Sequence, residues 1–504
     1  MEADAVVIGA GPNGLVAANM LADEGWDVVV CEEQAEPGGA VRSGEVAKEG
    51  FVHDRFSSFY PLAAASRYLA SLRLEEHGLR WLRCDAVVAQ PHPDGRCALL
   101  STDIEETKAS LDSFAAGDGE IWEGLFGLWR DAGQHLIDAL LTPSPPVRSG
   151  LALARALGPK RLGSFGRFAI MPARRFTNEL FRGEGGGWLL AGNALHADLT
   201  PDSAGGALFG WVLCGLGQEH GFPVPEGGAG KLTEALVRRL ESRGGAVVCD
   251  TPIERIEVTA GRARAALAAD GRRFGARRAV LADVGAPALY ERMLPRDAVP
   301  ERVRRWMRRF QYDNSTVKVN WAVSEPIPWA AEPARRASTI HVAEGMDGLS
   351  RTAGELVRGL IPSRPFLVLG QYSMLDPSRC PPGADVPWAY THVPQVIRGD
   401  AAGEIEGEVE GEAAERFADR MELEVERLAP GFRDTIVGRD VQTPRSLQEA
   451  DRNLVGGAVN GGTAQLQQQA IFRPYPSLGR PTTPVDGLYL ASASAHPGGG
   501  VHGG

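Results

Sequence analysis

Three glycines in a strict spacing near the beginning of the chain constrain the fold more than any other feature. Gly9, Gly11 and Gly14 follow a short apolar run over 5–8 and precede a helical stretch that ends near Gly25. A second apolar run follows and ends on an acidic residue. The order of strand, glycine turn, helix, strand and acid predicts a parallel βαβ unit whose turn accepts a dinucleotide.

Each residue of this unit has a distinct physical task. Gly9 allows the tight turn, Gly11 lets the backbone approach a pyrophosphate, and Gly14 lets the helix pack on the strand. The phosphates are expected at the helix N-terminus, where free N–H groups and the dipole favour anions. Glu32 follows Gly14 by 18 positions, where a carboxylate can accept hydrogen bonds from a ribose diol. The alternative is a βαβ unit that binds nothing, which three correctly spaced glycines disfavour.

Composition limits the classes of protein to which the chain can belong. The 504 residues carry 64 acidic and 53 basic side chains, for a net charge of −11. This balance disfavours a nucleic-acid partner and gives no attraction to anionic membranes, although a local apolar patch leaves peripheral membrane contact possible. Six scattered cysteines without a close pair predict neither a disulfide framework nor a metal site. With no secretory segment visible, we expect a cytoplasmic protein.

The α/β character of the first residues returns twice later in the chain. We predict helices at 66–83, 103–141, 227–245 and 413–428, and strands at 246–249, 253–258, 264–268, 279–283, 317–323 and 366–369. The return at 227 and again near 486 predicts that the chain leaves the nucleotide domain and re-enters it. We therefore expect a discontinuous nucleotide domain over 1–75, 225–285 and 445–504, and a substrate domain over 76–224 and 286–444. The Arg-rich run 302–309 is interpreted as a solvated helix face.

Three further segments show a family resemblance. They are Gly38–Ser43, the block 227–256 and the C-terminal string from Leu488 to His502, which contains HPGGGVH. Together with the glycine turn they resemble the FAD-binding superfamily of amine oxidases, phytoene desaturases and retinol saturase. The C-terminal string resembles its phytoene-desaturase-like branch, which includes pyridine nucleotide-disulphide oxidoreductase domain-containing proteins. The implied fold class is α/β, a discontinuous Rossmann-like FAD-binding domain with a mixed α+β substrate domain.

The resemblance also implies which residues hold FAD. It implies that the glycine turn holds the pyrophosphate, that Glu32 and its neighbour bind the adenosine ribose, and that the second glycine pair follows the phosphates to the flavin edge. One backbone position would hold adenine, and the C-terminal turn would pass the isoalloxazine. The implied residues are Gly9, Gly11, Pro12, Asn13, Gly14, Glu32, Glu33, Gly38, Gly39, Ala40, Arg42, Ile253, His496, Gly498, Gly499, Gly500 and Val501. In the resembled family a helix follows this turn, whereas the sequence stops at Gly504.

The sequence lacks the features of a disulphide reductase. Residues 40–52 contain no cysteine, and no second GxGxxG directly joins a strand to a helix. We therefore expect the substrate to reduce the flavin directly and dioxygen or a quinone to reoxidise it. No metal is expected.

No catalytic side chain can be assigned from the sequence. Among the histidines we considered His53, His196, His392 and His496, each of which is more often a structural residue than a proton carrier. The resemblance implies an enzyme that dehydrogenates, saturates or isomerises C–C bonds of an apolar small molecule, of carotenoid, polyene or polyketide type. The alternatives are an amine or amino-acid oxidase on the same fold, and a non-catalytic scaffold similar to GDP-dissociation inhibitors. Nine of the ten tryptophans lie outside the nucleotide segments, which suggests an apolar substrate cavity there or a well-filled core.

Overall fold

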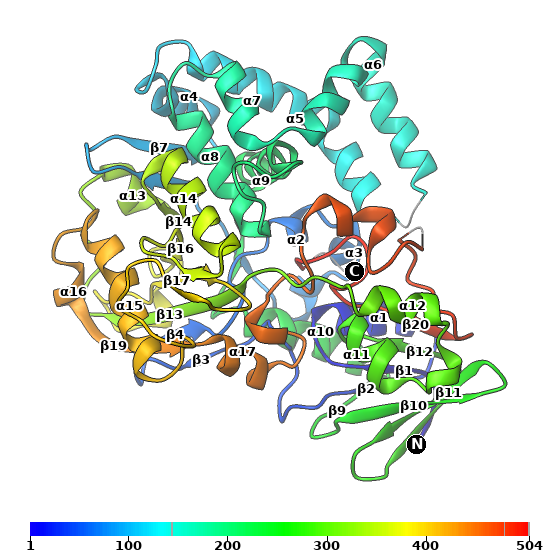
Figure 1. The fold of residues 1–504 in the computed structure, drawn as a ribbon. Coiled ribbons are helices and arrows are strands. Elements are labelled where there is room, and N and C mark those ends of the chain that lie inside the picture. The colour runs from blue at the N-terminus through cyan, green and yellow to red at the C-terminus, as the bar shows by residue number, and fades with distance from the viewer. Residues whose placement is uncertain (143–144, 478, 502–504) are drawn as a thin grey trace.

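The computed structural model describes residues 1–142, 145–477 and 479–501. Two seven-stranded sheets form the body of the molecule, and a layer of helices covers one end of it (Figure 1). Each sheet has its own hydrophobic core. The sites of interest lie where these parts meet.

The first sheet carries the nucleotide-binding unit. Its order is β10-β11-β12-β1-β2-β9, and β20 also pairs with β12. β1, β2, β9, the second half of β12 and β20 run parallel, whereas β10 and β11 are antiparallel. The strands are β1 (Glu2–Ile8), β2 (Val28–Cys31), β9 (Ala246–Val248), β10 (Ile253–Thr259), β11 (Arg262–Ala268), β12 (Arg273–Ala282) and β20 (Leu488–Leu490).

Strands from the beginning, middle and end of the chain therefore share one sheet. β2 is buried along its whole length, as expected of a parallel strand covered on both faces. α1 (Pro12–Asp23) and α10 (Gly230–Ser242) pack together, and α10 buries the stripe Leu232, Leu236 and Leu240. The division of the chain into two domains at the boundaries given above stays a prediction.

The second sheet has the order β19-β13-β17-β16-β14-β6-β7. Strand β13, which pairs with the edge strand β19 and with β17, is buried at all nine positions, and Trp321 and Trp329 belong to the same core. The strands are β6 (Ala86–Pro91), β7 (Cys97–Ser101), β13 (Ser315–Val323), β14 (Thr339–Val342), β16 (Leu367–Gly370), β17 (Trp388–Val393) and β19 (Ile436–Gln442).

Six helices form the layer beside β6 and β7 (Figure 1). They are α4 (Ile104–Asp112), α5 (Asp118–Leu140), α6 (Val147–Ile170), α7 (Ala173–Leu180), α8 (Gly185–Ala194) and α9 (Gly206–His220). Their shared core contains Trp122, Trp129, Trp188 and Trp211.

Shorter elements connect these layers. The helices are α2 (Pro61–Ala65), α3 (Arg67–Ser71), α11 (Ala286–Ala288), α12 (Glu301–Met307), α13 (Glu332–Arg336), α14 (Gly345–Val357), α15 (Glu412–Glu426), α16 (Phe432–Thr435) and α17 (Pro444–Ala450). Three small ribbons pair β3 (Ser43–Glu45) with β4 (Val52–Asp54), β5 (Trp81–Leu82) with β8 (Val224–Pro225), and β15 (Leu360–Ile361) with β18 (Gly399–Asp400).

The predicted helix over 66–83 is wrong in its length. α3 ends at Ser71, a 3₁₀ turn follows, and β5 begins at Trp81. The backbone is left-handed at Arg73 (φ 47°) and again at Gly78 (φ 93°). These two residues flank the 3₁₀ turn and prevent one continuous helix over 66–83. Among the helices of the described residues, none is long and apolar enough to cross a bilayer.

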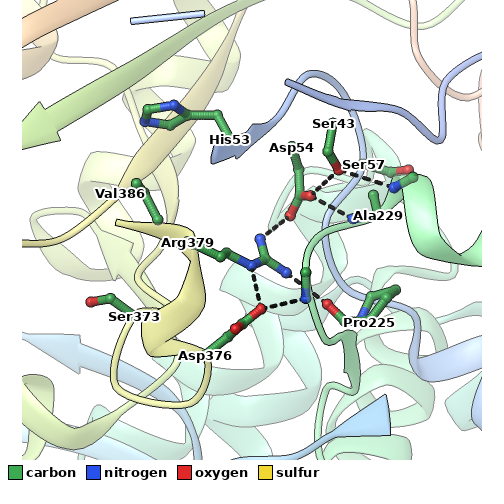
Figure 2. Close-up of polar contacts among 12 residues, drawn as sticks. Ser43, His53, Asp54, Ser57, Pro225, Ala229, Ser373, Asp376, Arg379 and Val386 are labelled. Carbon is green, nitrogen blue, oxygen red and sulfur yellow. Dashed lines mark hydrogen bonds and ion pairs between the residues drawn. The ribbon is translucent and has the colours of Figure 1, made fainter. Parts of the chain in front are cut away.

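A buried ion-pair network joins three segments that are far apart in the sequence (Figure 2). Arg379 donates from Nη1 to Asp54 at 2.8 Å and from Nε to Asp376 at 2.9 Å, and all three side chains are at most 1% exposed. Its third nitrogen donates to the carbonyl of Pro225 at 2.9 Å. Asp54 also accepts from Ser43 Oγ at 2.9 Å. Thus β4, the 225–230 turn before α10 and the segment after β16 are held at one point.

We predict that Arg379→Ala lowers the free energy of unfolding by about 3–5 kcal/mol, because it leaves two buried carboxylates without their cation. Urea unfolding followed by tryptophan fluorescence measures the change. Arg416→Ala is the matched control, since Arg416 pairs with Glu412 at 3.0 Å on the solvent-exposed face of α15. Equal unfolding midpoints for the two variants would contradict the importance of the network.

Candidate cofactor and substrate site

The glycine turn between β1 and α1 has no room for side chains. Gly9 adopts φ +94°, and a Cβ there would lie 2.8 Å from the carbonyl oxygen of Asp283. A Cβ at Gly11 would lie 2.6 Å from Asp283 Oδ2, and one at Gly14 would lie 2.2 Å from the Gly9 oxygen. Only glycine fits these three positions. No side chain therefore covers the backbone of the turn at the N-terminus of α1.

Asp283 supports the turn from below and is a residue that the sequence analysis missed. It follows β12, and its Oδ2 accepts a hydrogen bond from Gly14 N at 2.9 Å. Burial raises the pKa of its carboxyl to about 8. An additional anion under a phosphate site would repel the ligand, whereas a protonated carboxyl adds no charge there.

The Glu32 carboxylate lies at the end of β2, beside the turn. Its Oε2 accepts from Ala10 N at 2.7 Å and its Oε1 from Gln34 N at 2.9 Å. Burial raises the pKa of this carboxyl. A carboxylate has about four acceptor positions, so two hydrogen bonds leave it able to accept a diol. Within the described chain, the buried Oδ1 of Asn13 has no hydrogen-bond partner. These open acceptors and the bare turn fit a bound dinucleotide.

The second glycine pair packs against the first turn. Gly38 N donates to the Ala10 carbonyl at 2.8 Å, and a Cβ at Gly39 would lie 3.1 Å from Gly11 Cα. Arg42 is buried and binds inside the protein, donating to the carbonyls of Gly39 at 2.9 Å and Ala450 at 2.8 Å. It therefore fixes the glycine pair, and a contact with phosphates stays a prediction.

The segment before β10 runs beside Glu32. Thr251 N donates to the Glu32 carbonyl at 2.7 Å, and Asp250 N donates to the Gln34 carbonyl at 3.0 Å. Ile253 begins β10 two residues later. Glu33 turns to the surface and pairs with Arg452 at 2.8 Å. The first three predicted segments are thus neighbours around the turn.

The C-terminal glycine run packs against a loop that contains residues 460–473. A Cβ at Gly499 would lie 2.9 Å from Asn460 Oδ1, and one at Gly498 would lie 3.4 Å from Arg473 Cζ. Arg473 is fully buried and donates to the carbonyls of this loop and of Ala493. Val501 packs against the core below α1. The run therefore returns to the nucleotide unit, while residues 502–504, which include His502 of the string, lie outside the described residues.

A set of aromatic rings begins beside the second glycine pair. Ser57 Oγ donates to the Ala40 carbonyl at 2.7 Å, and two residues later Phe59 stacks on Phe222 with 4.9 Å between ring centroids. Trp388 lies 6.2 Å from Phe59 and stacks at the same distance on Tyr390. Three side chains in this region lie deep in the molecule and still keep some accessible surface: Phe59, Tyr390 and His196. We call Phe59, Phe222, Trp388 and Tyr390 the aromatic set.

Two buried histidines adjoin the aromatic set. His196 Nε2 and His341 Nε2 are 2.7 Å apart and share a hydrogen bond, and the His196 ring lies 5.7 Å from Phe59. Burial lowers the pKa of His196 to about 3 and that of His341 well below its usual value, so both rings are neutral at pH 7. The ring of His341 packs on the backbone of Gly192 in α8, where a Cβ would lie 2.3 Å from Nδ1.

The other histidines have different surroundings. Both ring nitrogens of His53 face carbonyl oxygens, at 3.2 Å for Phe51 and 2.9 Å for Trp321, which is a structural role. His392 is buried, and within the described chain neither ring nitrogen has a hydrogen-bond partner. Burial lowers the pKa of His496 beside the glycine run.

Lys318 is the second residue that the sequence analysis missed. It lies in the middle of β13, donates from Nζ to the Asp54 carbonyl, and has its Nζ 5.3 Å from the Trp388 ring centroid. Burial lowers its pKa to about 8. Of the tryptophans outside the nucleotide segments, Trp388 belongs to the aromatic set, whereas Trp129, Trp188, Trp321 and Trp329 are core residues.

Comparison with known proteins identifies similar chains. The family model described as flavin containing amine oxidoreductase matches residues 13–504. Pyridine nucleotide-disulfide oxidoreductase domain-containing protein 2 of Rattus norvegicus is 28% identical over 100% of this chain and 91% of its own length. A lycopene-forming phytoene desaturase of Pseudescherichia vulneris is 25% identical over 99% and 96%. Wild-type putrescine oxidase bound to putrescine has a similar fold, with a TM-score of 0.61 and 16% identity over 98% and 94%.

We predict that Glu32→Ala weakens dinucleotide binding by roughly ten- to a hundredfold, about 1.5–3 kcal/mol, because it removes the charged acceptor beside the turn. Titration of FAD into the apoprotein, read by quenching of flavin fluorescence, measures the change. Glu24→Ala at the exposed end of α1 removes an equal charge and is expected to bind normally. Unchanged affinity in the Glu32 variant would show that this carboxylate does not hold the ribose.

Proposed function

Because this chain belongs to the family of flavin-containing amine oxidoreductases and is an FAD-dependent oxidoreductase, we propose that it acts on carbon–carbon bonds. It dehydrogenates, saturates or isomerises an apolar small molecule of polyene, carotenoid or polyketide type. This proposal rests on the aromatic set and on the two neutral histidines beside it, His196 and His341. The neighbouring carboxylate of Asp54 is held by Arg379, Ser43 and Ala229, so it offers no free anion to a ligand.

The residues around the glycine turn fit FAD. We propose that Gly9, Gly11, Pro12, Asn13 and Gly14 hold its pyrophosphate, that Glu32 with Glu33 binds the ribose, and that Ile253 holds adenine through its backbone. Gly38, Gly39, Ala40 and Arg42 would line the path to the flavin, and the run His496, Gly498, Gly499, Gly500 and Val501 would lie at the ring. Bound FAD supplies the hydride acceptor, flavin N5.

His196 is a polar side chain that adjoins Phe59 and Phe222 of the aromatic set. Nδ1 of His341 faces the backbone of Gly192 without a partner in the described chain, and a buried unpaired N–H is costlier than an unpaired lone pair. His341 therefore carries its hydrogen on Nε2 and donates it to His196 Nε2. Neutral His196 then carries its hydrogen on Nδ1, where it can donate to a substrate oxygen or an ordered water.

One observation favours a second candidate, an amine oxidase. An amine oxidase is expected to have a pair of aromatic rings facing the flavin. The structure contains two stacked pairs, Phe59 with Phe222 and Trp388 with Tyr390. The two candidates differ in the charge of the substrate. A C–C substrate is neutral, whereas an amine enters as a cation at pH 7.

The remaining partners belong to the same proposal. The sequence has neither the cysteine pair nor the second nucleotide motif of a disulphide reductase, and dioxygen or a quinone would be the electron acceptor. A cytoplasmic enzyme with an apolar substrate must collect it from a lipid surface or a carrier, so peripheral membrane contact is part of the proposal.

We predict that neutral polyenes in detergent micelles bleach the flavin band of the anaerobic holoprotein, and that primary alkylamines do not. The basis is that the aromatic set adjoins neutral histidines and the Lys318 ammonium and, among the described residues, offers no free anion to an alkylammonium ion. Spectra recorded after anaerobic mixing measure the reduction. For a polyene that carries an oxygen, His196→Leu should slow bleaching up to about tenfold through loss of one hydrogen bond, while FAD content is unchanged. Reduction by the amines and not by the polyenes would replace the proposal with the amine oxidase.

We also predict that NADPH does not reduce the flavin within seconds. The same anaerobic mixing measures this, with dithionite as the control that the flavin is reducible. Rapid bleaching by NADPH would show that a second dinucleotide site exists without the motif sought in the sequence.

A further inference from the structure

The segment around α6 has a charge opposite to that of the molecule. Between Asp138 and Glu179 the sequence has no acidic residue, although the whole chain has a net charge of −11. The bases of this segment are Arg148, Arg155, Lys160, Arg161, Arg167, Arg174 and Arg175. The segment is therefore a local basic region on an acidic protein.

Within the described residues, some of these basic side chains form ion pairs and others do not. Arg161 pairs with Asp131 at 2.9 Å, and Arg167 pairs with Glu179 at 2.8 Å. Arg148, Arg155 and Lys160 are exposed and form no ion pair within the described part of the chain. Arg148 and Arg155 precede the kink at Gly158, and Lys160 follows it. Three unpaired cations in this segment would attract an anionic surface.

The same helix exposes large apolar side chains. Val147 is 69% exposed and Ile170 is 62% exposed, and Leu151 and Leu162 are also exposed between them. α6 is bent at Gly158, which precedes Pro159, and lies at the outer edge of the helical layer (Figure 1). Apolar side chains facing water together with bases are typical of helices that lie in a membrane interface.

A loop beside the end of α6 extends this apolar surface. Gly205 N donates to the Ile170 carbonyl at 3.2 Å, and a Cβ on Gly205 would lie 3.0 Å from Leu466. Leu466, Ile471 and Phe472 are all exposed. The sequence from 452 to 485 also has no acidic residue. We call the exposed apolar and basic side chains of α6, with these three loop residues, the docking face.

We propose that the docking face binds the surface of an anionic lipid bilayer. The bases contact lipid headgroups, and the apolar side chains enter the boundary between headgroups and acyl chains. A second copy of the chain fits this face less well, because a symmetric contact would bring unpaired bases together. This docking face rests on the proposed function in one respect, namely that membrane contact would give access to an apolar substrate. Membrane binding itself is measured without turnover.

The docking face also lies near the candidate site. The loop that contains Leu466 also accepts hydrogen bonds from Arg473 through its carbonyls. The C-terminal glycine run packs against Arg473. A membrane contact there would bring the lipid phase close to the residues proposed to surround the flavin. An apolar substrate would then have a short path from the bilayer, with little exposure to water.

Vesicle flotation of the full-length holoprotein tests the proposal. We expect binding to vesicles of phosphatidylcholine mixed equally with phosphatidylglycerol, weaker binding to pure phosphatidylcholine, and loss of the difference at high salt. Arg155→Gln with Lys160→Gln should weaken binding to the mixed vesicles about fivefold per charge. Leu162→Ser with Ile170→Ser should weaken binding to both kinds of vesicle by about tenfold or more.

Matched controls change the same chemistry elsewhere. Arg302→Gln with Arg305→Gln removes two exposed bases from α12, and Val357→Ser with Val396→Ser removes two exposed apolar side chains. Both controls should bind like the parent protein. The proposal is overturned if the parent does not float with the mixed vesicles, if controls and α6 variants lose binding equally, or if the α6 variants instead abolish a dimer seen by light scattering. Flavin reduction by micellar polyenes should persist in the α6 variants, which separates failure of docking from failure of the proposed reaction.

Discussion

A single buried cation, Arg379, holds together β4, the turn before α10 and the segment after β16. A guanidinium without solvent requires anions and carbonyls at fixed angles, and Asp54, Asp376 and Pro225 supply them. Asp54 is also the acceptor for Ala229 N at the start of the turn into α10. The turn into α10 and the segment after β16 are therefore fixed to β4 by one hydrogen-bonding geometry, in addition to the apolar packing around them.

The local parts of the nucleotide unit could be predicted because their signals are local. The spacing of Gly9, Gly11 and Gly14 with a following helix and Glu32 specifies a turn whose backbone is bare, and the structure confirms the close contacts at each glycine. The helix over 227–245 and the strands after it were also visible, since a leucine stripe and short β-branched runs have clear periods. Membership of the flavoprotein superfamily followed from these segments together.

The residues that the sequence did not reveal act over long separations. Asp283 meets Gly14 across 269 positions, and Arg379 meets Asp54 across 325. No local pattern distinguishes such side chains from solvated ones. Lys318 had a usable signal, because it interrupts an otherwise apolar strand where a charge is costly. The helix over 66–83 failed for the opposite reason: its apolar spacing was suitable, but left-handed backbone at Arg73 and Gly78 ended it.

The participation of β20 in the first sheet has a consequence for biosynthesis. β12 is complete at residue 282, yet its neighbour β20 is made more than two hundred residues later. During translation the strand edge that β20 will cover stays open, and Val280 and Ala282 have no partner on that side. Until β20 leaves the ribosome, this edge of β12 is open to pairing with other strands.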